Sequence, residues 1–202
     1  MLQAIALSLL LLFGPAAHAI EEPDFVVLQQ SEAFELRQVS PYMVAEVLHP
    51  GPREQADRDS FRLLFNYISG ANGGERKIEM TAPVTTEKRP AKIEMTAPVM
   101  STAAAGGFVT AFVLPRQFGR DNAPQPTDAR VQLREVPAQL LAVRRFSGRW
   151  TDERFASELA ALREAVARAG LTVVGEPMLS RFDPPIMPPF LRRNELWLRV
   201  VK

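Results

Sequence analysis

Apolar and polar residues alternate in short runs along the first part of the chain, a pattern that predicts β-strands at 25–28, 34–37 and 42–47. From Asp57 onward the spacing changes to i, i+3, i+4 and i+7, which is typical of one face of an α-helix. The apolar residues at this spacing are Phe61, Leu64, Phe65 and Ile68. Gly70 is expected to end the helix. Further strands are predicted at 77–84, 92–99 and 108–114.

The second half of the chain repeats this order of elements after a proline-rich linker at 115–130. Strands are predicted at 131–135 and 140–146, and a helix follows them. Thr151 suits the N-cap of this helix, and Gly170 suits its C-terminal cap. The last strands are predicted at 171–175, 179–182 and 195–201. The pattern therefore predicts an α+β fold, in which two pseudo-repeated β-α-β halves form an antiparallel β-barrel flanked by two helices.

An identical octapeptide, Lys-Ile-Glu-Met-Thr-Ala-Pro-Val, occurs at 77–84 and again at 92–99. Apolar and polar residues alternate within each copy, which predicts two half-buried strands joined as a hairpin by segment 85–91. Met80 and Met95 occupy the same place in the two copies. A thioether there could contact a flat apolar ligand, but the alternation by itself favours packing of both methionines in the core.

The first nineteen residues resemble a secretory signal peptide. An apolar run from Ala4 to Phe13 is followed by Gly-Pro and by the small-x-small sequence Ala17-His18-Ala19. The run is about half as long as a membrane span requires. We therefore expect cleavage near Ala19, a single domain at 20–202, and a periplasmic or secreted mature protein with no stable membrane insertion.

Composition excludes several kinds of site. The chain has no cysteine, so disulfides, thiolate nucleophiles and covalent c-type haem attachment are excluded. Its two histidines, His18 and His49, are too few for a multi-histidine metal centre. The formal net charge of +1 offers no general attraction for nucleic acid. No nucleophile elbow, phosphate-binding loop or dinucleotide fingerprint is present, and this favours a protein that is not an enzyme.

Three sequence motifs follow one another along the chain. They are Tyr-Ile-x-Gly-x-Asn at 67–72, the two Met-Thr-Ala-Pro-Val segments, and the C-terminal Phe-Asp-Pro-Pro and Arg-Arg-Asn-Glu-x-Trp at 182–197. Together these motifs resemble those of the SOUL haem-binding protein family. The resemblance covers the chain from about Phe25 to the C-terminus. It implies an antiparallel barrel with two helices and a non-enzymatic role in binding haem or another tetrapyrrole.

A haem site needs an apolar wall for the macrocycle and cations for the propionates. Phe61 and Phe65 lie on one stripe of the first helix, and Arg58 and Arg62 flank this stripe at helical spacing. The resemblance places the site against this helix, with an arginine at Arg58 and apolar residues at Phe61 and Phe65. Asn66 stands where well-known family members have lysine, which would weaken propionate pairing. The alternative is that the two phenylalanines simply pack the helix onto the sheet and that the arginines are solvated.

Iron ligation is the part of the site that the sequence supports least. His49 is the one histidine of the mature chain and therefore a candidate ligand, although a single loop histidine is usually just exposed. Tyr42 and Tyr67 are candidate phenolate ligands. Without an axial ligand, binding would depend on macrocycle burial and propionate pairing, and we expect micromolar affinity.

Other functions stay open on the sequence. The same apolar slot could bind a lipid or quinone without iron, and a hydrolase on this fold is a third possibility. Arg192 and Arg193 are expected to serve the structure at the start of the last strand rather than a ligand. No protein partner can be identified.

Overall fold

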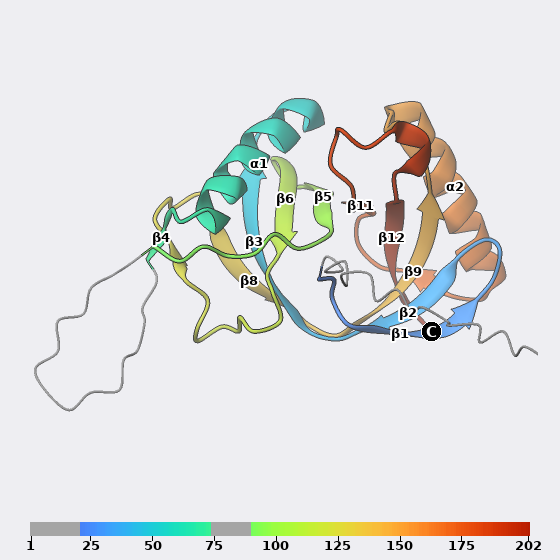
Figure 1. Cartoon of the computed structure of the whole chain (residues 1–202). Helices are drawn as coiled ribbons and strands as arrows, with labels where there is room; N and C mark the ends of the chain where they lie inside the picture. Colours follow the sequence, from blue (N-terminus) through green and yellow to red (C-terminus); the bar gives the residue numbers. More distant parts are fainter. Residues whose placement is uncertain (1–20, 74–89) are drawn as a thin grey trace, which may run out of the picture.

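The computed structural model describes residues 21–73 and 90–202 (Figure 1). The predicted signal peptide, the first octapeptide copy with Met80, and most of the connecting segment lie outside these ranges. Two helices, a short 3-10 turn at Pro189–Leu191 and twelve strands follow one another along the described chain. In order, the helices and strands are β1 (Phe25–Gln30), β2 (Glu35–Val39), β3 (Tyr42–His49), α1 (Arg53–Ile68), β4 (Asn72–Gly73), β5 (Val99–Ala104), β6 (Gly107–Val113), β7 (Gln125–Pro126), β8 (Gln132–Val136), β9 (Gln139–Phe146), α2 (Asp152–Arg168), β10 (Thr172–Val173), β11 (Met178–Arg181) and β12 (Asn194–Val201).

Ten of the strands form one antiparallel sheet with the order β1-β2-β9-β12-β11-β5-β6-β3-β8, and β10 pairs with β12. The pairing of β5 with β11 lies at the centre of a pseudo-symmetric arrangement. On either side of it, β6 and β12, β3 and β9, and β8 and β2 occupy equivalent places. Because β2 pairs with β9 and β8 pairs with β3, the two halves exchange a strand. The predicted pseudo-repeat is therefore present in the order of elements.

The sheet curls around a core on its inner face. Side chains from β2 and β8, which lie far apart in the sheet, belong to the same buried cluster, so the sheet must bend to bring them together. The members of this inner cluster are Val39, Val44, Met100, Ala111, Val113, Val136, Leu141, Val143 and Trp197. The result is a half-barrel, which confirms the predicted α+β class and antiparallel architecture.

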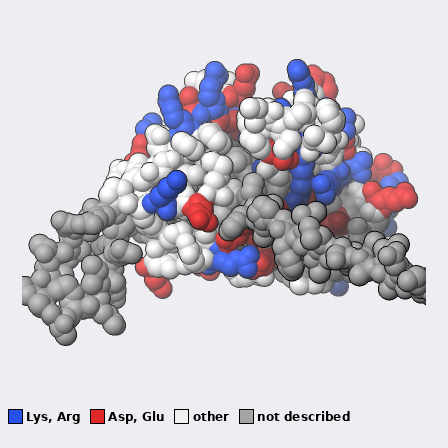
Figure 2. Space-filling view, viewed as in Figure 1, with Lys and Arg blue, Asp and Glu red and all other residues white. Residues whose placement is uncertain are grey.

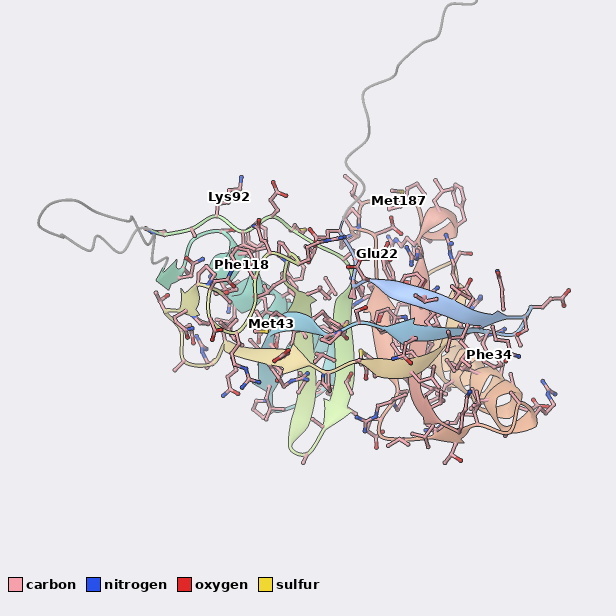
Figure 3. The ribbon with its side chains drawn as sticks, turned by 90° about the horizontal axis from the view of Figure 1, so that it is seen from below. Glu22, Phe34, Met43, Lys92, Phe118 and Met187 are labelled. Atoms are coloured by element: carbon pink, nitrogen blue, oxygen red, sulfur yellow. The ribbon has the colours of Figure 1, made fainter. Side chains whose placement is uncertain are left out.

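The two helices pack against the outer face of the sheet and form two separate clusters there. Leu64 and Tyr67 of α1 pack with Met43 and its neighbours, whereas Leu162 of α2 packs with Phe34 and residues of β9 and β12. Met43 and Phe34 accordingly lie in different halves of the molecule when it is seen from below (Figure 3). Within residues 21–73 and 90–202, no helix has the length and apolar character required to cross a membrane.

The ends of the two helices differ in how well the sequence predicts them. The Thr151 side chain accepts a hydrogen bond from the Arg154 amide at 3.1 Å, and Gly170 follows α2 with φ +70°, as predicted. Helix α1 begins at Arg53, four residues before the predicted Asp57. The added turn contributes Ala56 as its one buried apolar residue, so hydrophobic periodicity gave no signal there.

The second octapeptide copy is not the half-buried strand that alternation predicted. Only its last residue, Val99, enters β5. Ile93 and Ala97 are buried, but Met95 is 52% exposed, so the prediction that Met95 packs in the core is wrong. The Ile93 amide donates to the Ile68 carbonyl at 2.8 Å, and the segment therefore pairs with the end of α1 instead of a neighbouring strand.

Candidate ligand site beside the first helix

Helix α1 presents two different flanks to the sheet on which it packs. Successive residues are rotated by about 100° around a helix axis, so Asp57, Phe61 and Phe65 share one flank and Asp59 lies on the other. Asp57 accepts a hydrogen bond from Ser101 of β5 at 2.9 Å, which shows that the first flank faces the central strands. Strand β5 lies between the two helices in Figure 1, so this flank is turned toward the second helix.

Phe61 and Phe65 form a partly exposed aromatic surface on this flank. Their rings are stacked with centroids 6.2 Å apart, and Phe61 meets Phe112 of β6 edge-on at 5.2 Å. Phe61 is 40% exposed and Phe65 is 43% exposed, whereas Leu64 and Ile68 are buried. The predicted apolar stripe is thus divided, because two of its residues build the core and the two phenylalanines face solvent.

The two predicted cations differ in where they lie. Arg58 precedes Phe61 by three residues and Phe65 by seven, so it lies along the same stripe of the helix. Arg58 is exposed and forms no ion pair with the described residues. Arg62 points further from the sheet, and its guanidinium lies 3.9 Å from Asp59. Figure 2 shows cationic and acidic side chains over α1 and a mainly uncharged surface below them.

A polar cluster that the sequence did not reveal lies beneath the aromatic surface. The Asp57 carboxylate is 3.1 Å from the Arg181 guanidinium of β11 and also accepts hydrogen bonds from Ser101 and Thr110. Asp57 stands four residues before Phe61, so a charged residue within an amphipathic stripe was the available signal. The cluster joins α1 to the centre of the sheet and thereby fixes the position of the phenylalanines.

Arg53, at the start of α1, is held in an aromatic cage. Its guanidinium lies 4.8 Å from the ring centroid of Trp150 and 5.4 Å from that of Phe155, and it forms an ion pair with Asp152. Burial lowers the pKa of Arg53 from its ordinary value. These contacts join the beginnings of the two helices, and they engage Arg53 away from Phe65.

His49 lies apart from the predicted wall. Its Nε2 atom is 3.4 Å from the Asp59 carboxylate, on the flank of α1 opposite to Phe61 and Phe65. Its Nδ1 atom is buried and has no hydrogen-bond partner among the described residues. The structure therefore brings Arg58, Phe61 and Phe65 together and places His49 elsewhere.

The two tyrosines are also poorly suited to ligate iron as phenolates. Tyr67 is buried and its hydroxyl donates to the Pro124 carbonyl at 2.8 Å, and burial raises its pKa. Burial likewise raises the pKa of Tyr42 to about 12. Tyr42 lies on the inner face of the sheet, away from α1. Within the described ranges, no group of three or more carboxylate or histidine side chains could hold a metal ion.

The C-terminal arginines have the structural role that the sequence predicted. Arg193 binds Glu22 and Glu195 with nitrogen–oxygen distances of 2.6 and 2.8 Å. Arg192 donates to the carbonyl groups of Met187 and Pro185 within the proline-rich loop. The loop between β11 and β12 is thus fixed at its base, and it lies between the helices in Figure 1.

Comparison with known families identifies the family of this chain. A profile described as SOUL heme-binding protein matches residues 20–199, nearly the whole described chain. The chain belongs to the SOUL heme-binding protein family. The resemblance inferred from the three sequence motifs is therefore confirmed.

Relatives of this SOUL protein include animal proteins named Heme-binding protein 1. The protein from Xenopus laevis is 25% identical over 72% of both chains, and that from Sus scrofa is 24% identical over 73% of this chain and 72% of its own. These proteins share most of the domain with the present chain, at low identity.

Solved structures show that the fold also occurs at still lower identity. The C-terminal domain of EcmrR superposes with a TM-score of 0.58 at 12% identity, covering 84% of this chain and 97% of that one. A hydrolase from Listeria innocua gives 0.56 at 12% identity, covering 86% and 94%. At such identities the similarity establishes the fold alone.

Proposed function

We propose that this SOUL protein binds haem or a related tetrapyrrole non-covalently, without catalysing a reaction, at the aromatic surface beside α1. The observation that carries the proposal is the stacked, partly exposed pair Phe61 and Phe65 next to Arg58. A macrocycle lying on these rings removes apolar area from water, worth about 25 cal/mol per Å². A propionate can pair with the neighbouring guanidinium. The names of the family and of its animal relatives support the choice of ligand.

In this proposal binding does not depend on an axial ligand from His49 or Tyr67. His49 is turned toward Asp59 on the opposite flank, and the Tyr67 hydroxyl is engaged by a backbone carbonyl. Affinity then comes from macrocycle burial and propionate pairing. A dissociation constant near 1 μM corresponds to about −8 kcal/mol, which is the magnitude we expect.

The proposed role is transport, buffering or sequestration of the tetrapyrrole outside the cytoplasm, after cleavage near Ala19. Glu21 and Glu22 follow this point closely and pair with Arg116 at 3.0 Å and Arg193 at 2.6 Å. Cleavage after Ala19 would leave both ion pairs intact. Mass spectrometry of the protein recovered from the periplasm or medium tests this. A chain that begins at Ile20 is expected, and an intact N-terminus on exported protein would contradict the cleavage.

Titration with haem tests the ligand assignment directly. We expect a saturable shift of the Soret band with 1:1 stoichiometry, and metal-free protoporphyrin IX should bind within about fivefold of haem because iron ligation contributes little. His49→Ala should leave the haem-bound spectrum unchanged. No spectral shift at tens of micromolar would refute haem binding, and a His49→Ala spectrum that differs would restore His49 as ligand.

Paired variants test the location of the site. Phe61→Ser combined with Phe65→Ser should weaken haem binding at least tenfold, whereas Leu28→Ser, at an apolar side chain of β1 that is 54% exposed, should change it less than twofold. Arg58→Glu should weaken haem binding about tenfold, and the control Arg163→Glu on the exposed side of α2 should not. Equal effects of the test and control variants would place the site elsewhere.

A further inference from the structure

A cavity lies on the inner face of the half-barrel, on the opposite side of the sheet from the helices and from the aromatic surface. Its volume is about 440 Å³, within the range of small-molecule pockets. Strands β3, β5, β6, β8, β9, β11 and β12 contribute to its walls, together with the connections 137–138 and 174–176. The cavity is therefore the open end of the barrel interior, whose other part is filled by the inner cluster.

Small side chains on the β5–β6 hairpin explain why the barrel is hollow at this end. Residues of one strand alternate between the two faces of a sheet, and Met100 of the inner cluster identifies Thr102 and Ala104 as inward-facing. On β6, Val109 faces inward opposite Thr102, and Ala111 faces inward opposite Met100. None of these four side chains is large enough to reach across the barrel, so a space remains.

The floor of the cavity is apolar and polarisable. Met100 and Trp197 are each 4% exposed, and Met178 borders the same space. Thioether and indole groups adapt to the shape of an apolar body. The floor alone would accept many apolar molecules, so the polar groups around it must define the ligand.

Hydrogen-bond donors that have weak partners or none among the described residues surround this floor. The Tyr42 hydroxyl has the sulfur of Met100 as a weak partner at 3.8 Å and lies close to the Gln139 side-chain amide. The Nε2 atom of Gln139 is buried and makes no hydrogen bond of good geometry within the described residues. Arg199, at the mouth, forms no ion pair with any residue of the described ranges. Three such donors favour a ligand group that accepts hydrogen bonds and is negatively charged.

The other charges of the cavity do not cancel this preference. Arg134 is neutralised by Glu46 through two hydrogen bonds of 2.8 and 2.7 Å. Glu176 and Arg199 both lie at the rim and are exposed to solvent, so water screens both charges, and no ion pair joins the two among the described residues. Arg199 therefore remains the cation that a ligand can approach.

We propose that this cavity binds a small apolar carboxylate, such as a medium-chain fatty acid. Its hydrocarbon body lies against Met100, Met178 and Trp197, and its carboxylate faces Arg199 with Tyr42 or Gln139 as further donors. The site is independent of the aromatic surface beside α1, because the two lie on opposite faces of the sheet. The protein thus has places for two different apolar ligands.

Trp197 supplies a local reporter for the test. The chain has two tryptophans, so Trp150→Phe leaves Trp197 as the single one. Octanoate added to this variant should change Trp197 fluorescence saturably at sub-millimolar concentration. Octan-1-ol, which has the same chain but no charge, should bind at least fivefold more weakly. Absence of a saturable change, or equal binding of the alcohol, would overturn the proposal.

Variants in the same background locate the ligand. Ala104→Phe should close the mouth and weaken octanoate binding at least tenfold, whereas Ala105→Phe, at the next and equally exposed residue of the hairpin, should change it less than twofold. Arg199→Gln should weaken octanoate at least fivefold without affecting octan-1-ol, and Glu176→Gln should strengthen octanoate. Ala104→Phe that binds octanoate like its parent would refute the location.

Haem titration of the same variants separates this proposal from the proposed function. Ala104→Phe and Arg199→Gln should bind haem as the parent protein does, while circular dichroism confirms that they are folded. A parallel loss of haem and octanoate binding would show that the two sites are not independent, and would overturn the inner site as described.

Discussion

Replacing Glu195 by glutamine should destabilise the protein strongly, because this carboxylate is fully buried and holds a charged network. It accepts hydrogen bonds from Arg37 and Arg193 at 2.9 Å each and from the Trp197 indole at 2.7 Å. The Arg37 side chain is 7% exposed, so Glu195→Gln leaves a buried cation with less counter-charge. Such losses cost about 3–5 kcal/mol. Since Arg37 keeps Glu35 at 2.6 Å, we expect the lower end of that range.

Thermal and urea unfolding followed by circular dichroism measure this effect. A loss of about 3 kcal/mol corresponds to a fall in Tm of about 6–12 °C for a domain of this size. The control Glu164→Gln breaks an exposed ion pair with Arg168 and should cost less than about 0.5 kcal/mol. Adding Arg37→Met to Glu195→Gln should restore part of the stability, because the cation that lost its partner is removed. Equal losses in Glu195→Gln and Glu164→Gln would refute the reasoning.

Three further predictions concern local features. Burial raises the pKa of Tyr42 from the ordinary 10.0 to about 12. The neutral Tyr42 side chain should therefore stabilise the folded protein fully below pH 10, and this stabilisation should be lost as the pH rises toward 12. Tyr42→Phe should flatten the fall of the unfolding free energy between pH 10 and pH 12. Gly107→Ala should cost more than about 2 kcal/mol in urea unfolding, because a Cβ there meets the His49 carbonyl, whereas Gly106→Ala has open space and should cost about 1 kcal/mol. Thr151→Ala should lower the unfolding free energy by about 1 kcal/mol through loss of the α2 N-cap.

The architecture could be predicted from the sequence because its signals are local. Alternation of period two identified most strands, and the spacing of Phe61, Leu64 and Phe65 identified α1. The capping residues of α2 were equally readable. Where a signal was weak, the prediction failed, as at Arg53–Ala56, which extends α1 by one turn without an apolar pattern.

The octapeptide shows how tertiary contacts override a local pattern. Alternation predicted that Ile93 and Met95 share a buried face. Ile93 instead packs beneath α1, and its amide binds the end of that helix, while Met95 faces solvent. Period-two alternation describes an extended backbone but does not identify its neighbour, and here the neighbour is a helix rather than a strand.

The polar groups that organise the two faces could not be predicted, since each joins residues far apart in the chain. Asp57 meets Arg181 under the aromatic surface, and Glu195 meets Arg37 in the barrel. The spacing of residues in the sequence does not predict ion pairs between such distant positions. The sequence could group Arg58, Phe61 and Phe65 because they share one helix, whereas the exposure of Phe61 and Phe65 depends on how α1 sits on the sheet.

The two proposed sites follow from one geometric property of this fold. A curled sheet has an inner face that side chains must fill and an outer face that helices must cover. At the edge of the inner face the filling can be incomplete, and at the edge of the outer face the covering can be incomplete. Inside, alanine and threonine on the β5–β6 hairpin leave the barrel mouth open. Outside, α1 covers β6 with Leu64 and Ile68 but leaves Phe61 and Phe65 at its edge. Because strands of the same sheet separate these two edges, a ligand at one does not contact the other. Sequence changes could therefore alter either site while the core that holds the fold is kept.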